Sequence, residues 1–372
     1  MEITKIISIG DIELDIENII NEALSKSDIV IVVVPAYLTT DKKADLSIIK
    51  DVAGDVGQGL KEGALVLFET TLPVGTTRNI IGPILSKRSK KEISKDFHVA
   101  FSPERVSSGS ALRDLTTYPK IIGGVDSVAG EKASSFYSDV LGVNAILLPS
   151  SEAAELAKLM ELTFRDVNIA LANEFALCAQ RVGVDVTKAI EAANSQPYSN
   201  IHQPGIGVGG HCVPVNPWFF INGIGPAPLS ELAREINDGM ASEATRLLEE
   251  SLGPLDGKRI LILGLAYRGN VKEAYCSTTF LLVSALSAAG ADVLVNDPLF
   301  TDEEISSYGL TSAPLGTIAG DIAAVVLQAD HDGYKDIDWR SFQNCKIILD
   351  GRNALSRESI EQIGIQYIGI GI

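Results

Sequence analysis

The chain has 372 residues, of which 46% are hydrophobic and 21% are charged, and its formal net charge is −17. This length allows two or three domains with complete cores, and the acidic balance argues against a nucleic-acid-binding surface, which needs clustered Lys and Arg. No apolar run reaches the length of a membrane span and the first residues are not a signal peptide, so we expect a cytoplasmic protein.

The cysteines also point to a reducing compartment. They are widely spread and form neither a CxxC pair nor a cluster with histidines, which argues against a disulfide framework and against a zinc site. We therefore expect no bound metal. The four cysteines are Cys178, Cys212, Cys276 and Cys345.

Residues 1–150 alternate between helical and strand patterns. Helices are expected at 15–26 and 45–60, and strands at 28–34, 65–69 and 97–101. The first strand is a continuous β-branched run, which is typical of a strand covered on both faces of a parallel sheet. The alternation predicts an α/β domain, in which ligands bind beyond the carboxyl ends of the strands. Thr71, Glu104 and Arg105 fall at those ends.

Residues 151–255 are expected to form a central helical domain. A long helix is predicted at 151–182 with Ser151 as its N-cap, and further helices are predicted at 186–194 and 230–252. Lys158, Leu162 and Arg165 fall close together on one stripe of the long helix. A long central helix favours a subunit interface, and we expect a homodimer.

Residues 256–372 begin a second α/β domain after the Gly and Pro residues of 253–257. Strands are expected at 259–263, 292–295, 323–327 and 346–349, and a helix at 278–289. The predicted fold class is therefore α/β, with two Rossmann-like parallel-sheet domains, 1–150 and 256–372, joined by the helical domain 151–255.

One stretch, residues 205–217, combines four glycines, a single cysteine and two prolines. Glycine allows a backbone to approach a ligand closely, and proline stiffens the exit of a loop. A thiol on such a loop suits nucleophilic chemistry, because the reactive form is the thiolate. Taken alone, the pattern also fits a tight turn with a small buried cysteine.

Three motifs, read in order along the chain, remove that ambiguity. They are Phe101-Ser102-Pro103-Glu104-Arg105-Val106 followed by 118–124, then Lys158 with 165–170 and Asn173-Glu174, and finally Gly207-Val208-Gly209-Gly210-His211-Cys212. Together they resemble the UDP-glucose/GDP-mannose dehydrogenase family over about residues 28–352, and most resemble the branch that oxidises UDP-N-acetylmannosamine. The resemblance implies an NAD-dependent enzyme that oxidises the C6 alcohol of a UDP-sugar to a carboxylate in two steps.

The resemblance assigns the catalytic roles. Cys212 is the implied nucleophile, which forms a thioester with the sugar carbon, and Lys158 is the implied acid/base residue. Glu104 and Thr71 match positions that order water near C6. Without the flanking motifs, Lys158 also fits a solvated helix lysine.

The resemblance also implies the binding residues. Thr71, Glu104 and Pro35 belong to the implied NAD site. Substrate contacts are implied for seven residues, with Arg352 in the part that binds the uridine diphosphate. They are Arg105, Val106, Arg165, Gly209, Tyr267, Arg268 and Arg352.

The chain departs from the family pattern in its first domain and at single positions. No GxGxxG occurs in residues 1–150, so the usual first βαβ unit, which seats the NAD pyrophosphate on a helix N-terminus, is lacking from this domain. The changed single positions are Ala36, Leu162, which replaces an asparagine that holds the oxyanion, Gln196, Tyr198, Asn216 and Tyr275, which replaces a cofactor arginine.

Two interpretations follow from these observations. The retained Cys212, Lys158 and Glu104 favour an active NAD-dependent UDP-sugar dehydrogenase. The missing phosphate loop and Leu162 favour a non-catalytic relative that binds a nucleotide sugar or assembles with an active dehydrogenase. A structural protein without a ligand leaves the glycine-rich loop around Cys212 without a purpose.

Overall fold

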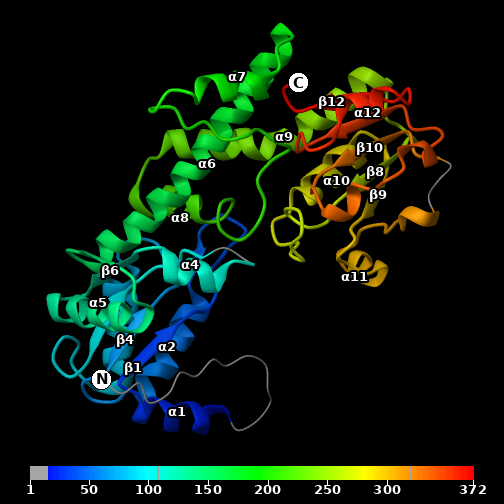
Figure 1. Ribbon diagram of the computed structural model, residues 1–372. Helices are drawn as coiled ribbons and strands as arrows, with labels where there is room; N and C mark the ends of the chain where they lie inside the picture. Colours follow the sequence, from blue (N-terminus) through cyan, green and yellow to red (C-terminus); the bar gives the residue numbers. More distant parts are fainter. Residues whose placement is uncertain (1–15, 107–108, 318–320) are drawn as a thin grey trace. The chain divides into compact units, whose positions relative to one another are not determined.

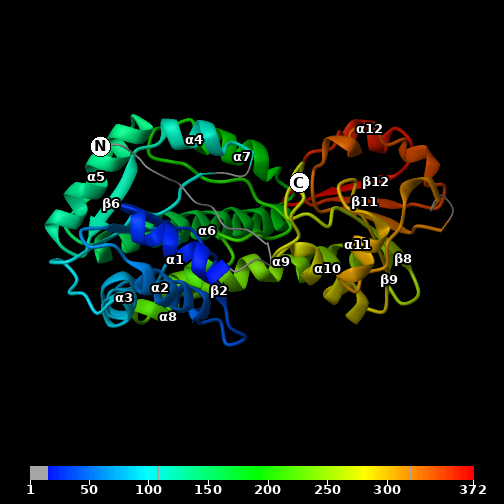
Figure 2. The same ribbon diagram turned by 90° about the horizontal axis from the view of Figure 1, so that it is seen from below.

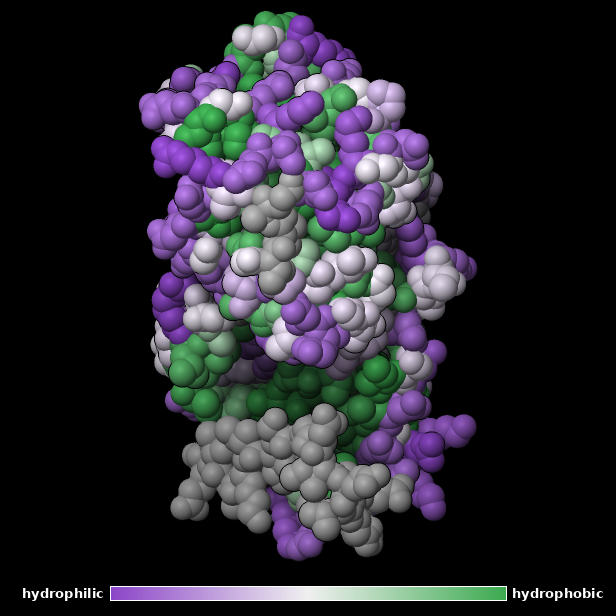
Figure 3. Space-filling view, turned by 90° about the vertical axis from the view of Figure 1, so that its right-hand side faces the viewer, coloured by the Kyte–Doolittle hydropathy of each residue, from purple (hydrophilic) through white to green (hydrophobic). Residues whose placement is uncertain are grey.

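The computed structural model describes residues 16–106, 109–317 and 321–372. The chain forms two compact units (Figure 1): unit 1 comprises Met1–Leu162 and Val215–Pro226, and unit 2 comprises Thr163–Pro214 and Ala227–Ile372. Hydrophilic residues cover much of the face seen in Figure 3, with a broad hydrophobic area in its lower part and smaller hydrophobic areas further up. The division into three domains stays a prediction.

Unit 1 contains a five-stranded sheet in the order β1-β4-β5-β6-β7. All neighbouring strands are parallel except β5 and β6, which run antiparallel, so the expected parallel sheet carries one reversed pair. The strands β6 and β7 were not predicted from the sequence. The strands are β1 (Ile29–Val32), β4 (Leu65–Phe68), β5 (His98–Phe101), β6 (Lys120–Gly124) and β7 (Ala145–Leu148).

Helices cover both faces of this sheet. In β4, Val66 and Phe68 pack with α2 (Ser47–Gly59) and α3 (Gly82–Ser89), while Leu65 and Leu67 pack with α5 (Ser127–Leu141) on the other face. Successive strand side chains point to opposite faces, so a strand covered on both sides must be apolar throughout. Figure 2 shows α2 and α3 on one side of unit 1 and α5 on the other.

The expected first helix of the described part is present as α1 (Ile16–Lys26). Within the described residues, β1 pairs only with β4 and no strand pairs with its other edge. Unit 1 also contains the short pair β2 (Tyr37–Leu38) and β3 (Ala44–Asp45), the π-helical turn η1 (Thr77–Ile81) and α4 (Ala111–Thr117). The described strands form the Rossmann-like sheet that the sequence predicted, and the predicted lack of a first βαβ unit concerns a part of the chain outside the described residues.

The long helix is confirmed as α6 (Ser151–Val182), which contributes to both units because their boundary lies after Leu162. Two further predicted helices are α7 (Val186–Ala193) and α9 (Pro228–Leu252). One helix, α8 (Asn216–Ile224), was not predicted, because Pro217 was interpreted as the stiff exit of a loop. Proline is accepted in the first turn of a helix, where its missing N–H has no partner anyway.

Unit 2 contains a fully parallel sheet in the order β12-β11-β10-β8-β9. The chain moves from β8 to β9 on one side and then to β10 on the other, so the topological switch point lies between β8 and β10. The strands are β8 (Arg259–Leu263), β9 (Asp292–Asn296), β10 (Ala324–Leu327), β11 (Ile347–Asp350) and β12 (Gln366–Gly369).

The core of unit 2 has two faces. Ile260 and Ile262 of β8 pack with α9 and with α10 (Thr278–Ala288), whereas Leu261 and Leu263 pack on the side of Tyr334. The short helices α11 (Asp302–Ser307) and α12 (Arg357–Glu361) complete this unit. The carboxyl ends of β8 and β10 are thereby placed side by side, and ligands of such sheets bind there.

Candidate active site

Unit 1 brings two implied cofactor residues to neighbouring strand ends. The Val34 N–H donates to Thr70 Oγ1 at 3.2 Å, and the Thr70 hydroxyl donates back to the Val34 carbonyl. Pro35 and Thr71 directly follow these two residues. The strands β1 and β4 therefore place Pro35 and Thr71 at the carboxyl edge of the sheet, the position predicted for Thr71.

Glu104 follows β5 and is fixed by its own backbone turn. Its Oε1 accepts from the N–H groups of Arg105 and Val106 at 2.6 and 2.8 Å. Its Oε2 lies 3.8 Å from Lys120 Nζ, and Lys120 also contacts Glu69 at 3.2 Å. Lys120 and Glu69 are both buried, and burial raises the pKa of Glu69. The sequence did not single out this buried ion pair, although Lys120 lies within the first family motif.

Lys158 and Arg105 share one carboxylate. Lys158 is only 5% exposed, and its Nζ lies 3.7 Å from Glu161 Oε1. Arg105 donates from Nε to Glu161 Oε2 at 2.9 Å and from Nη1 to the Pro119 carbonyl at 3.1 Å. Burial excludes the interpretation of Lys158 as a solvated helix lysine. Glu161, three residues after Lys158 on α6, is a site residue that the sequence-based reasoning missed.

A second α6 carboxylate fixes the loop after β4. Glu155 is fully buried and accepts from the N–H of Gly75, and from the N–H and hydroxyl of Thr77 at 2.8 and 2.6 Å. Burial raises the pKa of Glu155 to about 7, against the lowering effect of these hydrogen bonds. The loop that carries Thr71 is therefore tied to the same helix that carries Lys158.

In unit 2, the cysteine loop is fastened at its first residues. The Gly205 N–H donates to Asn173 Oδ1 at 2.9 Å, and the Ile206 N–H donates to the Gly351 carbonyl at 3.1 Å. Gly207 has a φ of 125°, and a Cβ there would lie 2.7 Å from Thr278 Cγ2. Glycine is required at this position because a side chain would be strained and would clash.

The second half of the loop packs against residues 267–277. A Cβ on Gly209 would lie 2.8 Å from Tyr267 Cβ, and the Gly210 N–H donates to the Tyr275 carbonyl at 3.2 Å. The thiol of Cys212, two residues on, is exposed. The alternative of a small buried cysteine is therefore excluded, and the residues just before Cys212 pack against the segment that carries Tyr267.

A buried polar network lies beneath the loop. Arg234 donates to Asp166 at 2.6 Å, and the Asn237 amide donates to the same carboxylate at 2.8 Å. Asn173, which holds Gly205, donates in turn to Asn237 at 2.9 Å. This network joins α6, α9 and the start of the cysteine loop. The second family motif contains Asp166 and Asn173, so the signal for it was present in the sequence.

The implied nucleotide residues gather at the switch point of unit 2. Tyr267 follows β8, and its carbonyl accepts from Arg352 Nη2 at 3.2 Å. Arg352 also donates to the carbonyl of Gln328, at the end of β10. Arg268 Nε donates to the Tyr267 hydroxyl at 3.0 Å. Three of the predicted substrate residues, Tyr267, Arg268 and Arg352, are therefore brought together.

Comparisons with known proteins show to which family the chain belongs. Residues 6–141, 152–239 and 261–357 match the NAD binding, central and UDP binding domains of the UDP-glucose/GDP-mannose dehydrogenase family. The chain belongs to this family. A UDP-N-acetyl-D-mannosamine dehydrogenase from Methanocaldococcus jannaschii is 37% identical over 93% of this chain and 80% of its own length.

Solved structures of the family have the same fold. A UDP-D-ManNAc dehydrogenase from Pyrococcus horikoshii superposes with a TM-score of 0.85 at 36% identity, covering 94% of this chain and 82% of the other. An NDP-N-acetyl-D-galactosaminuronic acid dehydrogenase from Methanosarcina mazei gives a TM-score of 0.83 at 29% identity, covering 94% and 79%. The family resemblance expected from the three motifs is confirmed.

Several family positions differ in this chain. Leu162, at the position of the oxyanion asparagine, is buried and only 6% exposed. The ring of Tyr275 stacks on His211, with centroids 4.1 Å apart, and His211 Nε2 lies 3.2 Å from Glu273 Oε2. His211 of the cysteine loop therefore forms a stacked aromatic pair with Tyr275, the position at which the resemblance implied a cofactor arginine.

The remaining changed positions lie elsewhere. Tyr198 is exposed, and the Gln196 side chain accepts from its N–H at 3.0 Å. Asn216 is buried at the first residue of α8. Arg165 is exposed on α6. Burial of the His202 ring lowers the pKa of His202, and the positive charge of Arg165 lowers it further.

The NAD binding domain of the family establishes NAD as the cofactor class. The described residues fit one wall of such a site, because Pro35, Thr71 and Glu104 follow neighbouring strands of the unit 1 sheet. The buried Lys120 ammonium lies between Glu69 and Glu104 at this edge. The glycine turn that seats a dinucleotide pyrophosphate has no counterpart in the sequence of residues 1–150.

The candidate site thus consists of two groups of residues. Lys158, Glu104 and Thr71 belong to unit 1, and Cys212 and the nucleotide residues belong to unit 2. The separation between Cys212 and Lys158 stays a prediction. Within the described part of the chain, no helix is long and apolar enough to cross a membrane, and no group of His, Cys, Asp and Glu residues is suited to hold a metal ion.

Proposed function

We propose that this chain is an NAD-dependent nucleotide-sugar 6-dehydrogenase that oxidises UDP-N-acetylmannosamine to the corresponding uronate. The observation that carries the proposal is the exposed Cys212 thiol on a glycine loop packed against Tyr267, at the switch point of the UDP binding domain. The substrate class follows the relatives named UDP-N-acetyl-D-mannosamine dehydrogenase.

The nucleotide half of the substrate is assigned to unit 2. Arg268 and Arg352 supply positive charge for a diphosphate, since a guanidinium matches phosphate oxygens with paired donors. Gly205 and Gly207 have no side chain, so the loop backbone lies close to Gly351 at the first position and to Thr278 at the second. The sugar C6 of a bound UDP-sugar is then presented to Cys212.

NAD supplies a hydride acceptor for each of the two oxidation steps. In the proposed sequence, Lys158 takes the proton of the C6 hydroxyl as the aldehyde forms. The Cys212 thiolate adds to the aldehyde carbon to give a thiohemiacetal, and loss of a second hydride leaves a thioester. The ammonium of Lys158 stabilises the negative oxygen of the intermediate.

Water then cleaves the thioester. We assign the positioning of this water to Glu104 and Thr71. Glu104 Oε1 accepts hydrogen bonds from two backbone N–H groups, and its Oε2 lies 3.8 Å from Lys120 Nζ. A carboxylate with one oxygen fixed by its own turn keeps its orientation. The products are the uronate and the free Cys212 thiol.

NADH production tests the proposal directly. The full chain is incubated with saturating NAD and UDP-N-acetylmannosamine, and absorbance is followed with Cys212→Ala and Cys178→Ala variants. We expect turnover that Cys212→Ala abolishes and that Cys178→Ala, which removes another exposed thiol, leaves unchanged. Equal loss in both variants, or no turnover with any of several nucleotide sugars, contradicts the proposal.

A second candidate function is that of a non-catalytic nucleotide-sugar-binding relative. It is favoured by Leu162, which offers an oxyanion no donor, and by the absence of a GxGxxG turn from residues 1–150. Removing one oxyanion donor typically lowers a rate by ~10²–10³. Saturable binding of UDP-N-acetylmannosamine in calorimetry without NADH production selects this second function.

We also propose a cytoplasmic homodimer. The free cysteines suit a reducing compartment, and α6 carries exposed apolar side chains at spacings of four and seven residues, which share a helix face. A monomer rarely leaves such a stripe uncovered. Light scattering after gel filtration should give twice the mass of 39.6 kDa, and a monomer mass contradicts the proposal. The stripe comprises Met160, Phe164, Leu171 and Phe175.

A further inference from the structure

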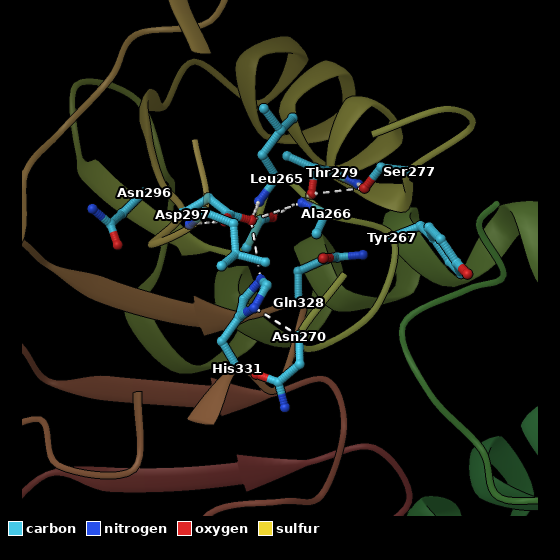
Figure 4. Close-up of polar contacts among 12 residues, drawn as sticks. Leu265, Ala266, Tyr267, Asn270, Ser277, Thr279, Asn296, Asp297, Gln328 and His331 are labelled. Atoms are coloured by element: carbon cyan, nitrogen blue, oxygen red, sulfur yellow. Dashed lines mark hydrogen bonds and ion pairs between the residues drawn. The ribbon is translucent and has the colours of Figure 1, made fainter. Parts of the chain in front are cut away.

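The loop after β8, residues 264–270, is held at both ends by one buried pair of side chains. The pair is Asp297, which follows β9, and His331, which follows β10. Both side chains are fully buried, and His331 Nε2 lies 3.1 Å from Asp297 Oδ2. Figure 4 shows the pair behind the loop, with Tyr267 projecting away from it.

Asp297 binds the first end of the loop. Its Oδ2 accepts from the N–H groups of Leu265 and Ala266, each at 2.8 Å. Its Oδ1 accepts from the Leu299 N–H at 2.9 Å. Burial by itself raises the pKa of Asp297, but the hydrogen bonds from His331 and the backbone hold it below its ordinary value. A buried carboxylate with this many donors fixes the backbone that supplies them.

His331 binds the other end of the loop. The Asn270 N–H donates to His331 Nδ1 at 3.0 Å. Since Nδ1 accepts, the ring proton of neutral His331 lies on Nε2, which donates to Asp297. Asn270 has a φ of 59°, and its amide exchanges two hydrogen bonds with Asp332, at 2.9 and 3.0 Å. The far end of the loop is thus fixed by the His331 imidazole together with the Asn270–Asp332 pair.

The residues between the two ends are the implied nucleotide contacts. Tyr267 and Arg268 lie between Ala266, bound to Asp297, and Asn270, bound to His331. Gly269 allows the close approach, because a Cβ there would lie 2.4 Å from the Asp330 carbonyl. The hydrogen bonds of Asp297 and His331 therefore hold the backbone on both sides of Tyr267 and Arg268.

We propose that Asp297 and His331 are positioning residues for the nucleotide of the substrate, acting through the conformation of the Tyr267–Arg268 segment. This inference rests on the proposed function, in which that segment contacts a UDP-sugar. Both side chains of the pair are fully buried, so in this proposal neither contacts the sugar carbon or NAD. Its loss should therefore weaken binding of the nucleotide and leave the chemical step and the NAD site intact.

The test compares UDP binding by the full chain in calorimetry. His331→Phe removes both ring hydrogen bonds and should weaken UDP binding by about tenfold or more, since each hydrogen bond contributes a factor of several. His331→Asn and His331→Gln each retain one of the two polar positions and should give intermediate affinities. Thr245→Val is the matched control, because it removes a buried hydrogen bond to the Ala241 carbonyl within α9, 3.1 Å long, and leaves the hydrogen bonds of Asp297 and His331 to the loop in place.

A purely structural role gives a different result. If His331→Phe and Thr245→Val lower the thermal midpoint alike and bind UDP alike, the positioning role is overturned while the proposed function stands. In an active preparation, the KM for the UDP-sugar should rise in His331→Phe with little change in kcat or in the KM for NAD. Absence of UDP binding by the unaltered chain overturns both the inference and the proposed function. If the His331→Phe variant does not fold, Asp297→Asn serves the same comparison.

Discussion

At the scale of single residues, burial distinguishes charged side chains that hold the site together from those that are simply exposed to solvent. Lys158 and Glu155 lie on the same turn of α6 and are both buried, whereas Arg165, further along the helix, is exposed. The family motifs predicted Lys158, but Glu155 was not predicted, because no periodicity shows where an acidic side chain is buried. Its partners Gly75 and Thr77 are distant in sequence, and only the folded chain brings them together.

We predict that Glu155→Gln removes a pH-dependent part of the stability. The folded pKa of Glu155, about 7, lies above its ordinary value of 4.5. The folded state therefore binds the proton more tightly, so this contribution is fully present below pH 4.5 and is lost as pH rises through 7. Denaturant unfolding at several pH values should show that the difference between wild type and variant changes across this window.

The same substitution has a second consequence. Glutamine presents an N–H₂ group to at least one of the donors that now face Glu155, which costs about 1–3 kcal/mol of unfolding free energy near pH 7. Ser25, which is exposed on α1, offers a neutral site for a control substitution. A pH-independent difference between Glu155→Gln and wild type contradicts the assigned pKa.

At the scale of elements, strands and long helices were predicted better than the segments between them. The apolar runs of β4 and β8 and the length of α6 are visible in the sequence, because strands buried on both faces and long amphipathic helices have strong patterns. In contrast, β7 and α5 were missed, since α5 is rich in small and polar residues. The cysteine loop was predicted as a loop, but its contacts with Asn173, Thr278 and Tyr267 depend on residues far away in sequence.

We predict that Gly209→Ala abolishes most of the activity while preserving the fold. The added Cβ would lie 2.8 Å from Tyr267 Cβ and 2.9 Å from the Cys276 carbonyl, so the loop must shift. A displacement of about 1 Å at a reacting group can lower a rate by about 10²-fold. The measurement is kcat in NADH production together with the thermal midpoint.

Gly239→Ala provides the control for this substitution. Gly239 lies in α9 with nothing within 4 Å of an added Cβ, so alanine should be tolerated there and should stabilise the helix slightly. Activity close to wild type in Gly209→Ala would contradict the prediction, because it would show that the loop accommodates a Cβ at this position without moving Cys212.

At the scale of the whole molecule, the two α/β sheets differ in what they offer a ligand. The unit 2 sheet contains its switch point between β8 and β10, flanked by strands on both sides. In unit 1, the described strands place β1 at the edge, and residues 1–150 contain no glycine fingerprint for a pyrophosphate. The family and its order of domains were predicted from three motifs, while the separation of Lys158 from Cys212 depends on two units and stays a prediction.

This difference predicts that the chain binds UDP more tightly than NAD. A helix N-terminus with its preceding glycine turn is the usual seat of a dinucleotide pyrophosphate, so we expect the Kd for NAD to exceed that for UDP by at least about tenfold. Separate calorimetric titrations of the full chain give both constants. An NAD affinity equal to or greater than that of UDP contradicts this prediction.

The distribution of the four thiols governs how the nucleophile can be identified by labelling. Burial raises the pKa of Cys345 to about 11, so an alkylating reagent should leave that sulfur unmodified. Cys178 and Cys276 are exposed together with Cys212, so inactivation by iodoacetamide alone does not name its target. Peptide mapping identifies the cysteine that is alkylated first. Repeating the labelling with bound nucleotide sugar shows whether that cysteine is protected, which distinguishes Cys212 from the other exposed cysteines.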